Sequence, residues 1–307
     1  MNVKLYIQQS SEFYEAGRGA KPHTAPLMYY YSFLNLAKAF CELRKPQIHE
    51  TQECYRHGLS WRPDPRVVVN METEEVLVTT RGMWHVLWES LSGIRCPATN
   101  PTRFRIRDLF AYCPEVSGEF GRAFSENDGL MEFETLDVLL DRSKHQAWMT
   151  FSINRQDLRR QRLLAARLLG QLGTSRSGYT EIKSSNRKIR TFQSANPVKL
   201  GRHETPHSAL HGDIVALNVF THCGREELRY FLANQTKMPF RLPQPIVLYT
   251  ILFWLSSLVR YDPHSVASLM DSSYWILIDG FMSQSRLWLL EQFEWAIYQT
   301  ETTLTIR

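Results

Sequence analysis

Two strong helical patterns, one near each end of the chain, restrict the folds that this sequence can adopt. Near the N-terminus, the apolar residues of Pro26–Leu43 recur at intervals of three and four, which is typical of a helix with one buried face. Near the C-terminus we expect three further helices, over Pro245–Arg260, Ser265–Met270 and Tyr274–Ile297, the last broken near residues 283–285. Apolar helices of this kind bury their faces against one another. The sequence therefore predicts a helical body to which both ends of the chain contribute.

The middle of the chain has a different pattern. Arg66–Thr80 holds two β-branched runs around a polar turn, which predicts a hairpin, and a helix is expected over Met83–Leu91. Strand-like segments then recur from Arg103 to Phe220, with one helix expected over Arg155–Leu172. We therefore expect an α+β fold. Its predominantly helical bundle comprises residues 1–100 and 221–307, and a central mixed α/β insertion comprises residues 101–220.

Positive charge is concentrated in part of the insertion. The whole chain has a formal net charge of +5, yet residues 155–190 alone hold ten basic residues against two acidic ones. A field of this kind favours phosphate-rich partners, although the same charges also suit a solvated helix face and a basic hairpin. The sequence predicts a nucleic-acid-binding surface made of Arg155, Arg159, Arg160, Arg162, Arg187, Lys188 and Arg190.

Several classes of protein are disfavoured. The longest apolar run, Ile246–Val259, is shorter than the roughly 18 residues that a membrane-spanning helix needs. The N-terminus lacks the basic start and apolar run of a secretion signal, so we expect a cytoplasmic protein that binds no membrane. The five cysteines include no C-x-x-C pair, and no phosphate loop, dinucleotide glycine pattern or G-x-S-x-G elbow occurs. We therefore expect no cofactor.

One stretch, GRHETPHSALHGD, raises the alternative of a metallohydrolase. His203, Glu204 and His207 match H-E-x-x-H, in which two histidines one helical turn apart hold zinc and the glutamate acts as general base. His211 lies one turn further on. Pro206 inside the motif removes a backbone donor and disfavours the helix that this geometry needs. We therefore expect a loop without a metal site, and zinc is the less favoured alternative.

Three segments resemble the YaaC-like family of bacterial proteins. They are PLMYYYSFLNLAKAF at Pro26–Phe40, HGLS at His57–Ser60 and LFWLSSLVRYDP at Leu252–Pro263, in the family's order and spanning nearly the whole chain. The first is the most specific. The family commonly has a tryptophan a few residues after its arginine–tyrosine–x–proline turn, where this chain has Ser265–Ala267. The resemblance implies an architecture rather than a reaction, since the family as such has no firm biochemical assignment.

The helical portion is also similar to the HEPN class of bundles, many of which are metal-independent ribonucleases of toxin and phage-defence systems. Their signature is an arginine followed, after four to six residues, by a histidine near the start of a helix, and the resemblance implies a homodimer. Arg44–His49 and Arg202–His207 have this spacing. Arg260–His264 is one residue short but lies between two expected helices. The structural alternative is that Arg260 caps its own helix while His264 lies near the N-cap of the next.

A polar stripe on the first predicted helix supplies further candidates. Asn35 and Lys38 are spaced three apart within the most specific YaaC-like segment. If the chain ends pack together, both can meet His57 and Arg260 across the bundle and form a pocket for a phosphate or a base. The candidate catalytic residues are therefore Arg260, His264, Lys38, Asn35 and His57.

These patterns favour a nucleic-acid-binding protein, with RNA preferred over DNA, that acts as a metal-independent HEPN-type ribonuclease in bacterial stress or phage defence. The basic surface would grip phosphates while Arg260 and His264 act on the 2′-hydroxyl and on the charge growing at phosphorus. The alternative is a catalytically silent adaptor or scaffold. The expected partners are therefore nucleic acid, together with a second copy of the chain or a partner protein.

Overall fold

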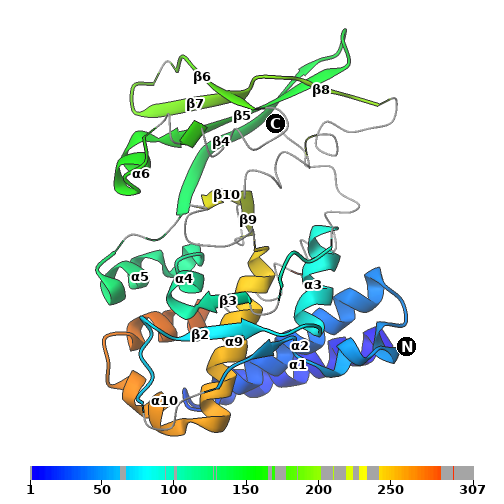
Figure 1. The fold of residues 1–307 in the computed structure, drawn as a ribbon, viewed down its shortest axis with the longest axis vertical. Coiled ribbons are helices and arrows are strands. Elements are labelled where there is room, and N and C mark those ends of the chain that lie inside the picture. The colour runs from blue at the N-terminus through cyan, green and yellow to red at the C-terminus, as the bar shows by residue number, and fades with distance from the viewer. Residues whose placement is uncertain are drawn as a thin grey trace. The chain divides into compact units, whose positions relative to one another are not determined.

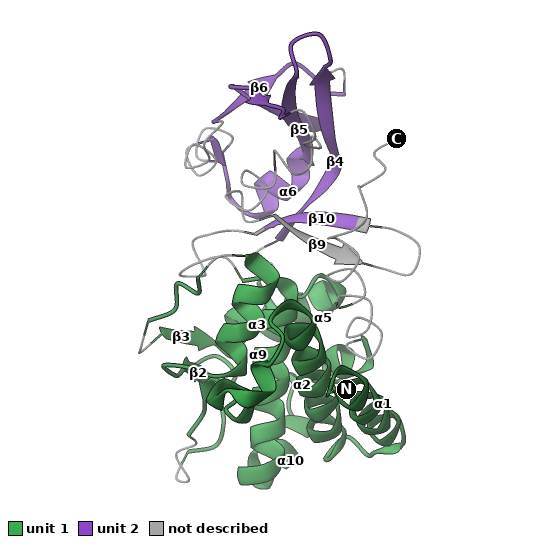
Figure 2. Cartoon of the chain, turned by 90° about the vertical axis from the view of Figure 1, so that its right-hand side faces the viewer, with its two compact units in different colours: residues 1–128, 242–297 green, residues 129–241, 298–307 purple. Residues whose placement is uncertain are grey.

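The structure is a computed structural model that describes residues 2–62, 67–93, 95–99, 102–126, 128, 130–164, 168–169, 178–184, 186–201, 210, 219–223, 228–233, 242–284 and 293. The chain forms two compact units (Figure 2). Unit 1 comprises Met1–Asp128 and Leu242–Ile297, and unit 2 comprises Gly129–Arg241 and Tyr298–Arg307. Unit 1 therefore contains two segments of the chain, with the main segment of unit 2 between them in sequence.

Helices α1 (Asn2–Gly19) and α2 (Ala25–Arg44) pack as a hairpin at the start of unit 1 (Figure 1). Small residues let them approach closely: Ser32 Oγ donates to Ser10 O at 2.9 Å, and a Cβ on Gly17 would lie 2.8 Å from the Tyr29 ring. α2 matches the predicted Pro26–Leu43 closely. α1 was not predicted, because its larger apolar residues do not share one buried face; Leu5 and Ile7 are both exposed.

Helix α9 (Gln244–Tyr261) is the centre of unit 1, since every residue from Gln244 to Leu258 is buried. A helix that is apolar on all sides needs neighbours on all sides. It packs on α2 through aromatic contacts, and on α3 (Met83–Ser92) where Trp84 Nε1 donates to Thr250 Oγ1 at 3.0 Å. The next helix, α10 (Pro263–Met270), begins after Asp262, whose side chain accepts from Ser265 N. Residues 275–284 are helical as well.

A three-stranded antiparallel sheet completes unit 1. Its order is β1 (Leu59–Ser60), β2 (Glu75–Val78) and β3 (Thr102–Arg105), with Leu59 opposite Val78. The predicted hairpin over Arg66–Thr80 is therefore wrong for the described residues, because β2 pairs with strands on either side of it in the sheet and residues 67–74 contain no strand. The remaining short elements of unit 1 are the 3₁₀ turns Ile48–Glu50, Gln52–Tyr55 and Pro114–Val116 and the helices α4 (Ile106–Phe110) and α5 (Ser117–Phe124).

In unit 2 the described strands form an antiparallel sheet in the order β6–β7–β5–β4–β10–β9, and β8 pairs with β5. The core side of the sheet carries a stack of aromatic rings, with Phe151 centred 4.8 Å from Phe133 and 5.2 Å from Phe192. The strands are β4 (Leu130–Asp141), β5 (Gln146–Asn154), β6 (Tyr179–Ile182), β7 (Ile189–Ser194), β8 (Val198–Lys199), β9 (Val219–Cys223) and β10 (Leu228–Ala233).

The helix predicted over Arg155–Leu172 is interrupted after Arg160, and among the later residues that the structure describes 168–169 are again helical. Helix α6 spans Arg155–Arg160 and closes with a Schellman-type turn, in which Arg162 has a positive φ of 50°. Leu163 N donates to Leu158 O at 2.8 Å and Arg162 N to Arg159 O at 2.9 Å, which satisfies carbonyls at the helix end. In the sequence the leucines continue at helical spacing past this turn. Periodicity alone therefore did not indicate that α6 ends at Arg160.

The α+β class is confirmed by the helices of unit 1 and the sheets of both units. The insertion was predicted over 101–220, and the main segment of unit 2 spans residues 129–241. Among the helices that the structure describes, none combines the length and the apolar character needed to span a membrane.

Candidate functional site

A close approach of two glycines fixes the backbone of His57 in unit 1. Gly82 has a φ of 145°, and a Cβ there would lie 2.3 Å from Gly58 N. Gly58 itself has a φ of 82°, and its own Cβ would meet Trp84 Cβ at 2.8 Å. Both positions therefore require glycine. The contact lets Trp84 N donate to His57 O at 3.1 Å, which ties the HGLS segment to the N-terminus of α3.

Two buried tyrosines hold the other side of His57. Tyr30 on α2 places its hydroxyl 2.6 Å from His57 Nδ1, and Tyr249 on α9 donates its hydroxyl to His57 O at 3.0 Å. The two hydroxyls lie 3.3 Å apart. The ring of Phe253 packs beside the imidazole, and the two ring centres lie 5.7 Å apart. Side chains from two helices thus converge on His57.

The imidazole of His57 is neutral near neutral pH. Burial and, to a smaller extent, the charges of Arg260 and Lys38 together lower its pKa from 6.5 to about 4. Burial also raises the pKa of Tyr30 and of Tyr249 far above the ordinary value, so both phenols keep their protons. Lys38 and Arg260 are therefore both close enough to His57 to act on it electrostatically.

The two cations have no carboxylate partner among the described residues. Lys38 is partly exposed and its Nζ lies 5.7 Å from the centre of the Tyr6 ring. Arg260 donates from Nε to Ser256 O at 3.2 Å, and its guanidinium lies 4.9 Å from the centre of the Tyr261 ring. Arg260 thus contacts a carbonyl of its own helix, which is the kind of contact that the structural alternative expects. It coexists with the charge of Arg260 acting on His57.

Asn35 and His264 are placed differently. Asn35 is buried in α2 and donates from Nδ2 to Tyr31 O one turn earlier, at 2.9 Å. His264 is the second residue of α10 and is exposed, and its side chain makes no hydrogen bond or ion pair to any residue that the structure describes. Arg260 and His264 flank the turn between α9 and α10, but the side chain of Arg260 is directed back along α9.

Of the other two arginine–histidine pairs, the structure describes Arg44 and His49 but not Arg202 and His207. His49 Nδ1 lies 2.9 Å from Glu42 Oε1, so this histidine is engaged by a carboxylate on α2. The guanidinium of Arg44 lies 5.4 Å from the centre of the Phe40 ring. The residues of the possible zinc motif and of the remaining pair fall outside the described residues: Arg202, His203, Glu204, His207 and His211.

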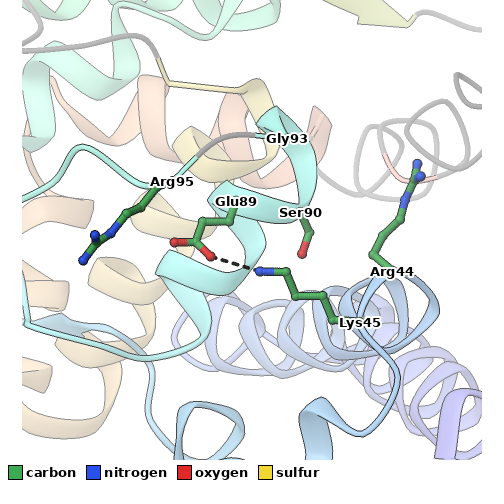
Figure 3. Close-up of a pocket in the computed structure, with 6 residues that line it drawn as sticks. All are labelled: Arg44, Lys45, Glu89, Ser90, Gly93 and Arg95. Carbon is green, nitrogen blue, oxygen red and sulfur yellow. Dashed lines mark hydrogen bonds and ion pairs between the residues drawn. The ribbon is translucent and has the colours of Figure 1, made fainter.

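A basic cavity of about 490 Å³ lies elsewhere in unit 1, between the end of α2 and the end of α3 (Figure 3). Among its lining residues, Lys45 Nζ pairs with Glu89 Oε2 at 3.0 Å, and Arg44 and Arg95 lie on either side of this pair. Ser90 and Gly93 complete the lining. The sequence analysis did not predict this cavity, because its residues come from two helix ends that no motif connects.

In unit 2, the start of α6 lies against the β6–β7 turn, because Arg155 N donates to Lys188 O at 2.9 Å. Two predicted surface residues are partly neutralised: Arg190 pairs with Glu181, and Arg160 lies 3.5 Å from Asp157 Oδ1. The exposed members of the predicted surface, for which the structure describes no ion pair, are Arg159, Arg162, Arg187 and Lys188.

Sequence reasoning did not assign Tyr30 and Tyr249 to the site. The available signal was the run of three tyrosines in α2, which was interpreted only as part of a buried stripe and of the YaaC-like segment. The hydroxyls matter here because they contact His57, and that contact joins positions 27 and 192 residues apart in the chain.

Comparison with protein families agrees with this arrangement of segments. A family described as "YaaC-like Protein" matches residues 2–294, which include both helical ends and the whole His57 environment. Comparison with curated proteins and with solved structures gave no match. The chain belongs to the YaaC-like family.

Proposed function

We propose that this protein binds nucleic acid, RNA in preference to DNA, and that Lys38, His57 and Arg260 in unit 1 hold a backbone phosphate. The observation that carries the proposal is that the charges of two cations, from helices far apart in sequence, both lower the pKa of the same imidazole. Like charges that lack carboxylate partners repel each other, and a bound anion removes that repulsion. A phosphodiester is an anion of the required charge.

The same three groups suit metal-independent cleavage of RNA. The 2′-hydroxyl attacks the adjacent phosphorus once its proton is accepted, and cations stabilise the charge that grows on the phosphoryl oxygens. Because the nucleophile belongs to the ribose, this chemistry acts on RNA and not on DNA. Lys38 and Arg260 supply the charges. His57 is unprotonated at neutral pH and is available as the proton acceptor. Asn35 and His264 remain candidates, with His264 paired with Arg260 as in the HEPN signature.

Unit 2 supports the same function through its exposed cations. Arg159 on α6 and Arg187 and Lys188 in the β6–β7 turn belong to two elements joined by a backbone hydrogen bond. Each phosphate contact to such a residue releases counterions and makes binding depend on salt. By analogy with HEPN ribonucleases we also propose that the working form is a homodimer and that the reaction serves stress or phage defence.

Cleavage is tested with purified protein and total RNA in EDTA. The proposal expects cleavage that persists in EDTA and falls by about 10²-fold or more in Lys38→Gln and Arg260→Gln, because each variant removes stabilisation of transition-state charge. Lys4→Gln is the matched control, since Lys4 is an exposed lysine of the same unit. His264→Ala tests the HEPN-type pair separately.

Binding is tested by the salt dependence of RNA affinity in the variant Arg159→Glu, Arg187→Glu, Lys188→Glu. The control reverses three exposed cations of the same unit, Arg142, Lys144 and Lys199. Weaker binding and a flatter salt slope in the first variant alone support the surface. Absence of turnover together with a stably co-purifying protein would instead support the adaptor function.

A further inference from the structure

Three hydrogen bonds around His57 form a closed loop. Tyr30 Oη meets His57 Nδ1 at 2.6 Å, Tyr30 Oη meets Tyr249 Oη at 3.3 Å, and Tyr249 Oη meets His57 O at 3.0 Å. Each bond needs one hydrogen. The carbonyl supplies none, and each phenol has only one to give.

Counting the available hydrogens shows which atom must supply the hydrogen of the third bond. Tyr249 donates to the His57 carbonyl, and Tyr30 then donates to Tyr249. The bond between Tyr30 and the imidazole is left without a hydrogen unless Nδ1 carries it. With the opposite tautomer, Tyr30 donates to Nδ1 and the two phenol oxygens face each other at 3.3 Å with no hydrogen between them. Only the Nδ1–H tautomer satisfies all three contacts.

We propose that Tyr30 and Tyr249 are positioning residues that hold His57 as the Nδ1–H tautomer, so that Nε2 offers a lone pair to the ligand and serves as the proton acceptor of the site. This inference rests on the proposed function for its substrate, since the proton accepted is that of the ribose 2′-hydroxyl. The loop itself is a property of unit 1 and does not depend on what binds there.

Other features of the site maintain this arrangement. Burial keeps hydrogens on both phenols, so neither becomes a second acceptor for Nδ1 as a phenolate. The His57 carbonyl also accepts from Trp84 N at 3.1 Å, which holds the backbone end of the loop in place. Tyr30 and Tyr249 are fully buried, so water does not compete for their hydroxyls.

The chemical step balances without any further reactant. Nε2 takes the proton of the 2′-hydroxyl while the 2′-oxygen forms a bond to phosphorus and the bond from phosphorus to the 5′-oxygen breaks. The imidazolium then has hydrogens on both nitrogens, and its Nε2 proton passes to the departing 5′-oxygen. The products are a 2′,3′-cyclic phosphate and a 5′-hydroxyl. Bound phosphate offsets the charges of Lys38 and Arg260, which favours the imidazolium during this step.

The tautomer is measured directly by nitrogen-15 NMR of histidine-labelled protein, with the His57 signals assigned by their loss in His57→Gln. The wild type is expected to show a protonated Nδ1 and an unprotonated Nε2. A protonated Nε2 in the folded wild type overturns the inference. This measurement uses no RNA, so failure here is distinct from failure of the proposed function, which is judged by cleavage.

Tyr249→Phe is the sharpest variant, because Tyr249 contacts the backbone of His57 and not its ring. Without the Tyr249 hydroxyl, Tyr30 is free to donate to Nδ1, so the tautomer is expected to reverse and cleavage to fall by about 10²-fold. Tyr31→Phe is the control, since it removes a neighbouring hydroxyl outside the loop. An unchanged tautomer in folded Tyr249→Phe contradicts the proposed role of the loop.

Discussion

Replacing Gly82 by alanine tests whether the contact between two glycines places His57. The new Cβ would lie 2.3 Å from Gly58 N, 2.5 Å from Gly58 Cα and 2.9 Å from Arg56 O. All three are backbone atoms, so no side chain can rotate away. A non-glycine residue in a sparsely populated backbone region costs about 1–3 kcal/mol, and overpacking a tight contact costs about 1–3 kcal/mol more. We expect Gly82→Ala to lower the free energy of unfolding by about 3 kcal/mol or more.

Gly93→Ala separates backbone strain from steric contact. Gly93 also has a positive φ, 72°, but nothing lies within 4 Å of its would-be Cβ. We expect this control to cost about 1–2 kcal/mol. Urea unfolding followed by tryptophan fluorescence suits the comparison, because Trp84 and Trp88 lie on α3 directly after Gly82. Equal costs for the two variants would refute the argument that the approach of Gly58 demands glycine at position 82.

Three further outcomes follow from the described contacts. The unfolding free energy is expected to fall as pH drops from about 6.5 to about 4, because His57 binds a proton in the unfolded chain before it does in the folded one, and His57→Gln removes this part of the pH dependence. NMR titration is expected to show a higher His57 pKa in Arg260→Ala than in wild type, with no change in Lys45→Ala, since Arg260 and not Lys45 lowers that pKa. Thr250→Val leaves the buried Trp84 indole N–H without its acceptor and is expected to cost about 1–3 kcal/mol in urea unfolding, whereas Thr250→Ser keeps the hydroxyl and costs less.

The parts of the fold that follow from local pattern were predictable. α2 and α9 are long, strongly apolar and bounded by prolines, and both agree with prediction to within one or two residues. The errors occurred where non-local pairing decides the structure. Val67–Val69 has the β-branched composition of a strand, yet Val69 N bonds Ser265 Oγ of α10, and β2 finds its partners at residues 59–60 and 102–105. No local pattern encodes those partners.

The candidate site shows the same division. That Lys38 and Asn35 meet His57 and Arg260 was expected from the packing of the two chain ends, and in unit 1 the charges of Lys38 and Arg260 contribute to the lowered pKa of His57. The tyrosine loop could not be derived, because it depends on which face of α2 and of α9 turns toward residue 57. Tyr30 is fully buried whereas Tyr31, its neighbour in sequence, is only partly so, and the sequence alone does not decide which of the two hydroxyls reaches the imidazole.

Stability alone does not account for the charges near His57. Burial already disfavours the imidazolium, and Arg260 and Lys38 disfavour it again. The two cations are therefore not needed to keep the imidazole of His57 neutral. Arg260 donates to Ser256 O one turn earlier in α9, and Ser256 is itself buried. Two cations without a described carboxylate partner, both lowering the pKa of one imidazole, are the arrangement expected of a site whose charges a ligand balances. A bound anion would supply that balance, which is the physical reason for proposing a phosphate at this position.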